Sequence, residues 1–577
     1  MIKKFKDKIQ NGVLLIQQSR KLTNLEFLQE FKIHKLELRE CNNINSIPKL
    51  TSSTIQELII CYSDIQYFDC ISLENLEVFI VQGNKELKNC FFERFKYLKH
   101  LDISSTYIDI SNINIMLPQL RILKLNSNEI RDISSLSNLL NLEELDLSGN
   151  EGIDINHLQS LKQLIRLQLS FCNLKSINQL SVLTNLTELD VSGNISIRIN
   201  TLKYLINLKK LNIYRTKTKN INILKSLNRL EELDISENEI ADINVLKYLV
   251  NLAKLNIFQT KVQCIEILLQ LEYIKELDLS EKPEIDFQPL QKMVQLQKLS
   301  LQCNKLKNIS FLSGLINLQI LNLSCNSNID ITPLQYLVNI TNLVLSQCEI
   351  NDISSLRTLL NLEVLDISSN QINNIRHLQD LDKLTYLNLS YTSVKDISVL
   401  KFFKCLKNLC LSRNKGVDIT PLQYLTQLTQ LMVNECDLHE ISTLRSLVNL
   451  EYLDISRNQI YYFYPIKELD ANVYVPGNLI DESSDYFTYF GVKNKSKLIK
   501  QQPTKQQIQH AEILKVVDIS TSFIRDTNTQ RQKYLSSKQI AATKIVQLQQ
   551  QQLNEFQSFT DKVVQLFTLL DSHFECQ

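Results

Sequence analysis

Apolar residues return along this chain in one fixed pattern, LxxLxLxxN, in which three leucines are followed by a polar residue. One copy reads Leu142, Leu145, Leu147 and Asn150, and between residues 98 and 450 the copies follow one another every 22 residues without an insertion or deletion. A fixed period of this length predicts a solenoid, in which each repeat adds one short strand and one return turn to a stack. We number the positions of a repeat from its first leucine, so that Asn150 stands at position 9.

The pattern continues on both sides of this regular block. Further copies begin at Leu76, Ile55 and Ile33, which brings the number of full repeats to 20. A weaker copy is visible at residues 14–19, and residues 473–478 repeat the strand and turn positions after a shortened step of 20 residues. An open solenoid needs caps that shield its terminal apolar faces. We therefore expect a cap with a degenerate repeat at 1–32, a solenoid of about 20 repeats plus a closing unit at 33–480, and a basic linker with a glutamine-rich helical tail at 481–577.

Alternation within one repeat predicts a strand with two different faces. Leu145 and Leu147 point into the core, whereas Glu144 and Asp146 point outward and line a concave sheet face. Asn150 is expected to turn inward at the end of the strand. There its side-chain amide can donate to and accept from backbone groups that the bend leaves unpaired.

The return segment of a repeat is expected to be a single helical or 3₁₀ turn. Thr332-Pro333 and Thr420-Pro421 each place a capping residue type before a proline. Proline at the first turn is typical of helix starts, because its missing N–H has no helical partner there.

The polar residue at position 9 alternates between repeats. It is asparagine at 150 and 194 but cysteine or threonine at 172 and 216, which implies a 44-residue unit. Lys282 stands at this position in one repeat and cannot accept a hydrogen bond. We expect a locally irregular turn there, which reflects either sequence drift or a functional hinge.

These units, and particularly the segment DISSLRTLLNLEVLDISSNQI at 352–372, resemble the 22-residue leucine-rich repeats of two groups. One is the leucine-rich-repeat regulatory subunit of protein phosphatase 1, and the other is the bacterial internalins. The resemblance covers about residues 33 to 480. It implies an α/β solenoid, namely a curved leucine-rich-repeat array with a parallel concave β-sheet and short helical or 3₁₀ turns on the convex side. It also implies noncatalytic protein recognition through the concave face.

The chain departs from both groups. We find no secretion signal or wall-anchor motif, which disfavours a surface adhesin. The ending VYVPGN at 473–478, followed by a long tail, is unlike the short cap of the phosphatase regulator. Phosphatase binding is therefore not carried over to this chain.

Composition narrows the classes of partner. With 63 Lys and Arg against 62 Asp and Glu, the formal net charge is +1, so bulk charge gives no reason to expect a nucleic-acid partner. No segment supplies roughly 18 continuous apolar residues, so we expect no membrane span. The 13 cysteines are scattered, and several occupy buried repeat positions. This pattern is typical of reduced thiols and favours the cytoplasm, or else the nucleus.

No residue pattern predicts catalysis or a cofactor. His100, Asp102 and Ser104 alternate onto one face, but in a working triad the imidazole lies between the hydroxyl and the carboxylate. No histidine cluster has metal-ligand spacing, and nine glycines leave no phosphate-binding glycine loop. Cys303 and Cys325 share position 8 of adjacent repeats, so their Cα atoms could lie in the disulfide range. Reduced neighbours and a redox-active pair are both compatible with this spacing.

Charge on the concave face follows two rows. Outward residues at position 3 alternate in sign and should form a self-neutralising ladder: Glu144, Arg166, Glu188, Lys210, Glu232, Lys254, Glu276 and Lys298. Position 5 adds aspartates that no equal basic row matches: Asp102, Asp146, Asp190, Asp234 and Asp278. The middle of the face is thus predicted to be net acidic and to suit a partner with a basic surface.

Aromatic residues near the strand ends mark the candidate binding site. Phe171, Tyr214 and Phe258 occur in alternate repeats and are predicted to form one exposed outward row. Exposed aromatics beside charge are enriched in interface hot spots. The predicted partner-binding set is Phe171, Tyr214, Phe258, Glu188, Glu232 and Asp234, and a second, more dispersed candidate is Tyr386, Tyr391, Arg413 and Tyr452.

The periodicity stops at Asp481. A lysine-rich linker follows, and apolar residues with heptad spacing from Phe556 to Leu570 predict a short helix, which would dock on the solenoid, bind a partner or dimerise. The oligomeric state stays open. We expect a noncatalytic protein-binding scaffold or regulatory subunit. The alternative is a structural or cytoskeletal spacer that assembles through its C-terminal helix.

Overall fold

The computed structural model describes residues 95–479 without a gap and, before them, residues 9, 11–17, 25, 28, 32–41, 43–44, 46–47, 54–63, 65–68, 73, 75–85 and 87. The chain divides into two compact units, Met1–Phe523 and Ile524–Gln577, and every described residue lies in the first. The expected linker and helical tail at 481–577 lie outside the described residues.

One parallel sheet organises the described residues. Its 22 strands pair in the order of the chain. They are β1 (Val13–Gln17), β2 (Lys35–Arg39), β4 (Glu57–Cys61), β6 (Val78–Ile80), β7 (His100–Asp102), β8 (Ile122–Lys124), β9 (Glu144–Asp146), β10 (Arg166–Gln168), β11 (Glu188–Asp190), β12 (Lys210–Asn212), β13 (Glu232–Asp234), β14 (Lys254–Asn256), β15 (Glu276–Asp278), β16 (Lys298–Ser300), β17 (Ile320–Asn322), β18 (Asn342–Val344), β19 (Val364–Asp366), β20 (Tyr386–Asn388), β21 (Asn408–Cys410), β22 (Gln430–Met432), β23 (Tyr452–Asp454) and β24 (Asn472–Tyr474). A separate small sheet pairs β3 (Ser46–Ile47) with β5 (Tyr67–Phe68).

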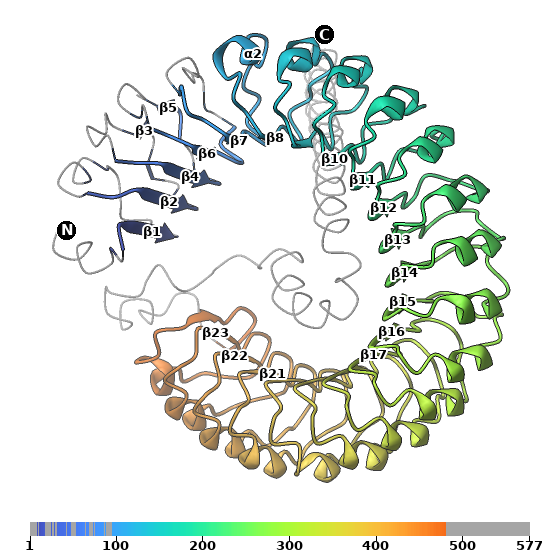
Figure 1. Ribbon diagram of the computed structural model, residues 1–577. Helices are drawn as coiled ribbons and strands as arrows, with labels where there is room; N and C mark the ends of the chain where they lie inside the picture. The colour runs from blue at the N-terminus through green and yellow to red at the C-terminus, as the bar shows by residue number, and fades with distance from the viewer. Residues whose placement is uncertain are drawn as a thin grey trace, which may run out of the picture. The chain divides into compact units, whose positions relative to one another are not determined.

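Short helical turns connect the strands. They are α2 (Ile113–Met116) and the 3₁₀ helices η3 (Ser134–Asn138), η4 (Asn156–Ser160), η5 (Asn178–Val182), η6 (Asn200–Tyr204), η7 (Asn222–Ser226), η8 (Asn244–Tyr248), η9 (Glu266–Gln270), η10 (Gln288–Lys292), η11 (Ser310–Gly314), η12 (Thr332–Tyr336), η13 (Ser354–Thr358), η14 (Arg376–Leu378), η15 (Ser398–Phe402), η16 (Thr420–Tyr424), η17 (Ser442–Ser446) and η18 (Tyr464–Ile466). Figure 1 shows the strands along the inner side of the array and these turns along its outer side. The predicted leucine-rich-repeat solenoid is confirmed.

The 22-residue period sets the register of the sheet. Each strand of the regular block places the same repeat position opposite its neighbour, as Leu145 lies opposite Leu167. Leu142, Leu145 and Leu147 are fully buried, so the inward set forms one continuous stacked core. Strands also form outside the full repeats. β1 pairs with β2, and Val473 of β24 pairs with Leu453 across the shortened step. The boundaries of the caps at 32 and 480 stay predictions.

The asparagines at position 9 form the expected hydrogen-bonded ladder. Asn150 donates through Nδ2 to the carbonyls of Leu125 and Leu147, at 3.0 and 2.8 Å. Its Oδ1 accepts from the backbone N–H groups of Asn128 and Ile130, at 3.1 and 2.9 Å. One side chain thus satisfies four backbone groups at the bend.

The alternation at position 9 has a counterpart in the turns. Before an asparagine repeat, the N–H at position 11 donates to the asparagine side chain, as Leu174 does to Asn194 at 2.9 Å. A cysteine offers no such acceptor, so Gly152 donates instead to the backbone carbonyl of Cys172 at 2.9 Å. Gly152 takes a φ of +81° to do so, which suits a residue without a Cβ. The turn type thus follows the residue at position 9, and it does not alternate where Asn150 follows Asn128 or Asn326 follows Asn304.

The start of each return turn is capped differently from the expectation. Thr332 and Thr420 do begin 3₁₀ helices, but their side chains are not the caps. The carboxylates two residues earlier, Asp330 and Asp418, accept from the threonine N–H groups at 2.9 Å. The capping residue therefore stands at position 13 of the repeat.

Lys282 causes the irregularity that its position predicts. The backbone bond from Gln259 N to Ser280 O beside it is 3.4 Å, whereas the next one along, from Glu281 N to Gln302 O, is 2.8 Å. The buried ammonium bonds a different carbonyl from the ladder amides, because Lys282 Nζ donates to Thr260 O, 22 residues earlier, at 2.7 Å. Burial lowers the pKa of Lys282 to about 8. Drift and a hinge both remain compatible with this turn.

Candidate protein-binding site

The charges at position 3 neutralise one another, as expected. Arg166 binds Glu144 at 2.7 Å, and Lys210 lies between Glu188 at 4.0 Å and Glu232 at 3.5 Å. The same alternation continues through Lys254, Glu276 and Lys298 at 3.4 to 3.6 Å. Glu188 and Glu232, which belong to the predicted binding set, are therefore paired within the sheet face.

The expectation of an exposed acidic row at position 5 is wrong. Asp234 is only 9% exposed, and its Oδ1 accepts from the Ser236 backbone N–H at 2.9 Å. Its Oδ2 accepts from Asn256 Nδ2 at 3.1 Å. Burial raises the pKa of Asp234 to about 7. The strand ends at this residue, so its carboxylate turns to the N–H that the bend frees two residues later and does not face a partner.

The expected exposed aromatic row is also wrong. Phe171 and Tyr214 are only 7% and 5% exposed, and Phe258 is half-buried. Phe171 stands at position 8, where its ring lies across Gly193 of the next repeat. Tyr214 and Phe258 stand at position 7, and the Tyr214 hydroxyl hydrogen-bonds Glu237 Oε1 at 3.0 Å. The three rings thus do not form one row, because 43 residues separate the first two and 44 the last two. A role for this set in partner binding stays a prediction.

The second candidate contains an exposed cluster, which we call the strand-end row and define as Tyr391, Arg413, Glu435 and Arg457. The Arg413 guanidinium lies 4.6 Å from the centre of the Tyr391 ring, and this tyrosine is 49% exposed. Glu435 accepts from Arg413 at 2.9 Å and from Arg457 at 3.0 Å. All four residues stand at position 8 of consecutive repeats, a spacing that the sequence displays.

The other two members of the second candidate lie on the sheet itself. Tyr386 is buried and Tyr452 is half-buried. They belong to a stretch in which position 3 carries no charge. After Lys298, the residues at this position are Ile320, Asn342, Val364, Tyr386, Asn408, Gln430 and Tyr452. The concave face thus changes from a charged half to an uncharged half between β16 and β17.

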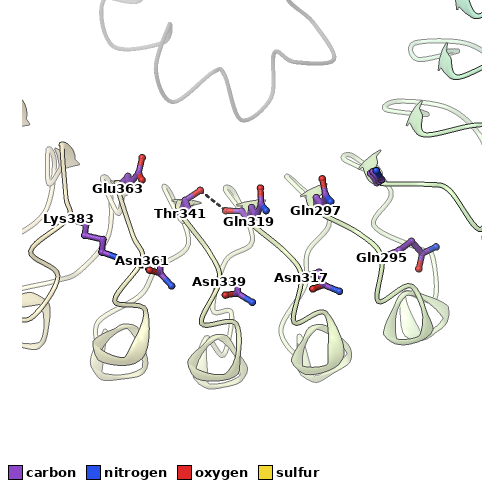
Figure 2. A pocket seen from close by; sticks show the side chains of 10 residues that line it. Gln295, Gln297, Asn317, Gln319, Asn339, Thr341, Asn361, Glu363 and Lys383 are labelled. Atoms are coloured by element: carbon purple, nitrogen blue, oxygen red, sulfur yellow. Dashed lines mark hydrogen bonds between the residues drawn. The ribbon is translucent and has the colours of Figure 1, made fainter.

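An open groove of about 610 Å³ runs along the edge where the strands begin. Figure 2 shows its two rows of side chains, with Gln297, Gln319 and Thr341 above and three asparagines below. The asparagines Asn317, Asn339 and Asn361 donate to carbonyls of the preceding repeat, as Asn317 does to Val294 at 2.9 Å. This second ladder was not predicted, although asparagine before the first leucine recurs along the chain.

The groove is lined by side chains that can form hydrogen bonds. Its lining is mostly amides and also includes Lys275, Glu363 and Lys383, the last two of which lie near one end of the groove in Figure 2.

Outside the groove, the Ser104 hydroxyl donates to Asp102 at 2.5 Å, so these two residues are hydrogen-bonded to each other at the end of one strand. Across the described part of the chain, no group of three potential metal ligands gathers and no helix is long and apolar enough to cross a membrane.

Comparisons with known proteins also identify leucine-rich repeats in this chain. A family model for the leucine-rich repeats of "leucine-rich repeat and WD repeat-containing protein 1" matches residues 65–157, and a model for two leucine-rich repeats matches residues 294–336. A search of curated proteins found no match.

Three solved structures illustrate the similarity. An internalin, InlF, from Listeria monocytogenes is 26% identical over 52% of this chain and 83% of its own, with a TM-score of 0.39. Internalin C2 from the same organism is 31% identical over 33% and 82%, with a TM-score of 0.31. A leucine-rich-repeat protein from Leptospira interrogans is 23% identical over 69% and 95%, with a TM-score of 0.42.

The family models and the observed architecture point to the same family. The matched segments fall within the 22-residue units whose leucines form the core and whose asparagines form the ladder. Stacked repeats of this kind generate extended concave surfaces for binding other proteins. The chain belongs to the leucine-rich-repeat proteins.

Proposed function

We propose that this protein is a noncatalytic scaffold or regulatory subunit that binds a partner protein on the concave side of the solenoid. The observation that supports this most directly is the strand-end row beside the uncharged half of the sheet. Tyr391 is half-exposed there under the Arg413 guanidinium. Tyrosine and arginine are the residue types most enriched in interface hot spots.

Charge pairing favours this half over the charged half. A partner on β9 to β16 would have to desolvate or displace ion pairs such as Arg166–Glu144. From β17 to β23, the outward residues at position 3 are neutral, so covering the sheet there removes no charge from water, and the ion pairs of this half that a partner would meet are those of the strand-end row. We therefore place the contact on the uncharged half.

The same row sets the chemistry of the partner. It carries two guanidinium groups, Arg413 and Arg457, on the single carboxylate of Glu435. One cation is left in excess, so the partner surface should present an acidic group beside an apolar one. This proposal replaces the basic partner, because the aspartates that motivated it are buried.

Affinity purification of the full chain from its native cell tests the proposal. We expect Tyr391→Ser combined with Arg413→Ser to lose a partner that wild type retains. A Phe171→Ser, Tyr214→Ser and Phe258→Ser variant tests the original site, and a Gln297→Ala and Gln319→Ala variant tests the groove. Circular dichroism must show that each variant is folded. If the first variant keeps every partner, the proposed surface is wrong. If only removal of residues 481–577 loses assembly, the spacer alternative is favoured.

We also propose a cytoplasmic or nuclear location. Buried thiols support it, because Cys172, Cys348 and Cys436 each donate to a backbone carbonyl at 3.2 Å and take part in the ladder as S–H groups. A compartment that keeps thiols reduced preserves these donors. Microscopy of the tagged full chain would decide between these locations and secretion.

A further inference from the structure

Two cysteines face each other where the charged and uncharged halves meet. Cys303 follows β16 and Cys325 follows β17, and both stand at position 8. The backbone bonding between neighbouring repeats continues through them. The Cys303 N–H donates to Ser324 O, and the Cys325 N–H donates to Ser346 O, each at 2.9 Å.

The local backbone brings the two thiols together. Cys303 and Cys325 have nearly equal φ angles, +57° and +60°, so their Cβ atoms leave the chain in the same direction. Adjacent strands lie about 4.8 Å apart, which is inside the Cα range of disulfides. The two side chains are close enough to interact, and the Cys325 thiol also donates to Gln347 Oε1 at 3.2 Å. Both residues are half-exposed, so a small reagent can reach them.

The other described cysteines provide a contrast. Cys172, Cys348 and Cys436 are buried, and their thiols are bound to carbonyls. Cys264 and Cys405 are exposed, but the neighbouring repeats carry no cysteine at their positions. The sequence places cysteine at the same position of consecutive repeats only at 303 and 325.

We propose that Cys303 and Cys325 form a modification site, a dithiol that converts reversibly to an intrachain disulfide by exchange with a small disulfide such as oxidised glutathione. In the first step, one protein thiolate attacks the reagent. The reagent S–S bond breaks, a mixed disulfide forms, and one small thiol leaves after taking up a proton.

In the second step, the other protein thiolate attacks the protein sulfur of the mixed disulfide, and a second small thiol leaves. The two protein thiols are oxidised with the loss of two hydrogens, and one small disulfide is reduced to two thiols. Burial, followed by the nearby Cys325, raises the pKa of Cys303 to about 12. The Cys303 thiolate is therefore scarce at neutral pH, and its attack on the reagent should accelerate as the pH rises.

The bond would fix one defined junction. It would join the last repeat of the charge ladder, which holds Lys298, to the first uncharged repeat, which holds Ile320. Since these residues lie on neighbouring strands, oxidation would tie the two halves of the concave face together without involving the buried core.

Intact mass and peptide mapping of the full chain test this site. We expect wild type incubated with oxidised glutathione at mildly alkaline pH to lose two hydrogens and to yield linked peptides containing Cys303 and Cys325. Dithiothreitol should reverse the link. Cys303→Ser and Cys325→Ser should each retain one glutathione on the remaining cysteine of the pair, because no neighbouring thiol displaces it. Cys264→Ser is the matched control and should still form the link.

Three results would overturn the proposal. They are a stable glutathione on both Cys303 and Cys325 in wild type, a link to some other cysteine, and the absence of any link at alkaline pH in protein that circular dichroism shows to be folded. None of these results bears on partner capture by the strand-end row, so the two proposals fail separately.

Discussion

At the scale of single residues, the aspartates at position 5 have a structural role that their outward register hides. Asp190 and Asp234 accept from the serine N–H two residues later, and Asn212 and Asn256 of the next strands donate to them at 3.2 and 3.1 Å. These hydrogen bonds join side chains of neighbouring strands on the sheet face, as the position-9 asparagines join neighbouring repeats at the bend. A carboxyl group at such a buried position has only neutral hydrogen-bond donors around it. Its ionisation therefore costs more free energy there than in water.

Asp234 should make stability depend on pH. Its pKa is raised to about 7 in the fold, against 3.8 for the unfolded group, so the fold binds more protons between these values and loses stability as the pH rises. We expect the unfolding free energy of wild type, relative to Asp234→Asn, to fall by about 1 to 3 kcal/mol between pH 5 and pH 8. Urea titration of both proteins measures this difference.

The hydrogen bond from Asn256 is lost in Asp234→Asn at every pH. Its loss therefore shifts the plot of unfolding free energy against pH by a constant amount and leaves the slope unchanged. The other position-5 aspartates are present in both proteins, and among them Asp190 is coupled to Asp234, because its charge contributes to the raised pKa of Asp234. Parallel pH profiles would mean that Asp234 stays ionised in the fold.

At the scale of elements, the bend after each strand depends on one side chain. Asn326 is fully buried and donates to Leu301 O and Leu323 O at 3.0 and 2.7 Å. It accepts from the N–H groups of Asn304 and Leu306, both at 3.0 Å. We expect Asn326→Leu to cost about 1 to 3 kcal/mol, because leucine fills the space and leaves buried backbone groups unpaired. Chemical denaturation measures the loss.

Cys348→Ser is the control for this bend. A serine hydroxyl can donate to Leu323 O as the thiol does, so the change should be milder. If Asn326→Leu proves as stable as wild type, the ladder bonds contribute nothing net and packing alone determines the turn.

The sequence was informative about the elements but less so about the site. Periodicity predicted the strands, the inward leucines and the asparagine ladder, because these follow from repeat position alone. The burial of Phe171 depends on the absence of a side chain at Gly193 one repeat later, which is a tertiary contact. The burial of Asp234 depends on the bend that follows it. Only the 43-residue step from Phe171 to Tyr214 warned that the aromatic row was not one row.

At the scale of the whole molecule, the stability of an array is a sum over repeats and their interfaces, so one weak interface has an effect beyond its own turn. Lys282 introduces such an interface in the middle of the regular block. The bond from Gln259 N to Ser280 O is 3.4 Å there, and a buried ammonium replaces the amide.

Lys282→Asn should strengthen this interface. An asparagine would donate to the carbonyls 25 and 3 residues earlier and would accept from the N–H groups of the preceding turn, as Asn150 does. We expect a gain of about 1 kcal/mol in the free energy of unfolding. Denaturant unfolding checks it, with Lys292→Asn, a change of the same type at an exposed position of η10, as the control. An equal or lower stability than wild type would contradict the ladder argument and favour a lysine retained for a hinge.

The register of the sheet also bears on how such a chain can change its length. In the regular block every strand pair joins residues 22 apart, so each repeat touches little besides the repeats before and after it. Contacts therefore stay local in sequence however many repeats are added. We expect folding to start at one nucleus and to spread from repeat to repeat. Asn150 follows Asn128 and Asn326 follows Asn304 without a break in the ladder, so a single 22-residue repeat can be gained or lost. Duplication and deletion would then shift the boundary between the charged and uncharged halves in steps of one strand, while the fold itself stays unchanged.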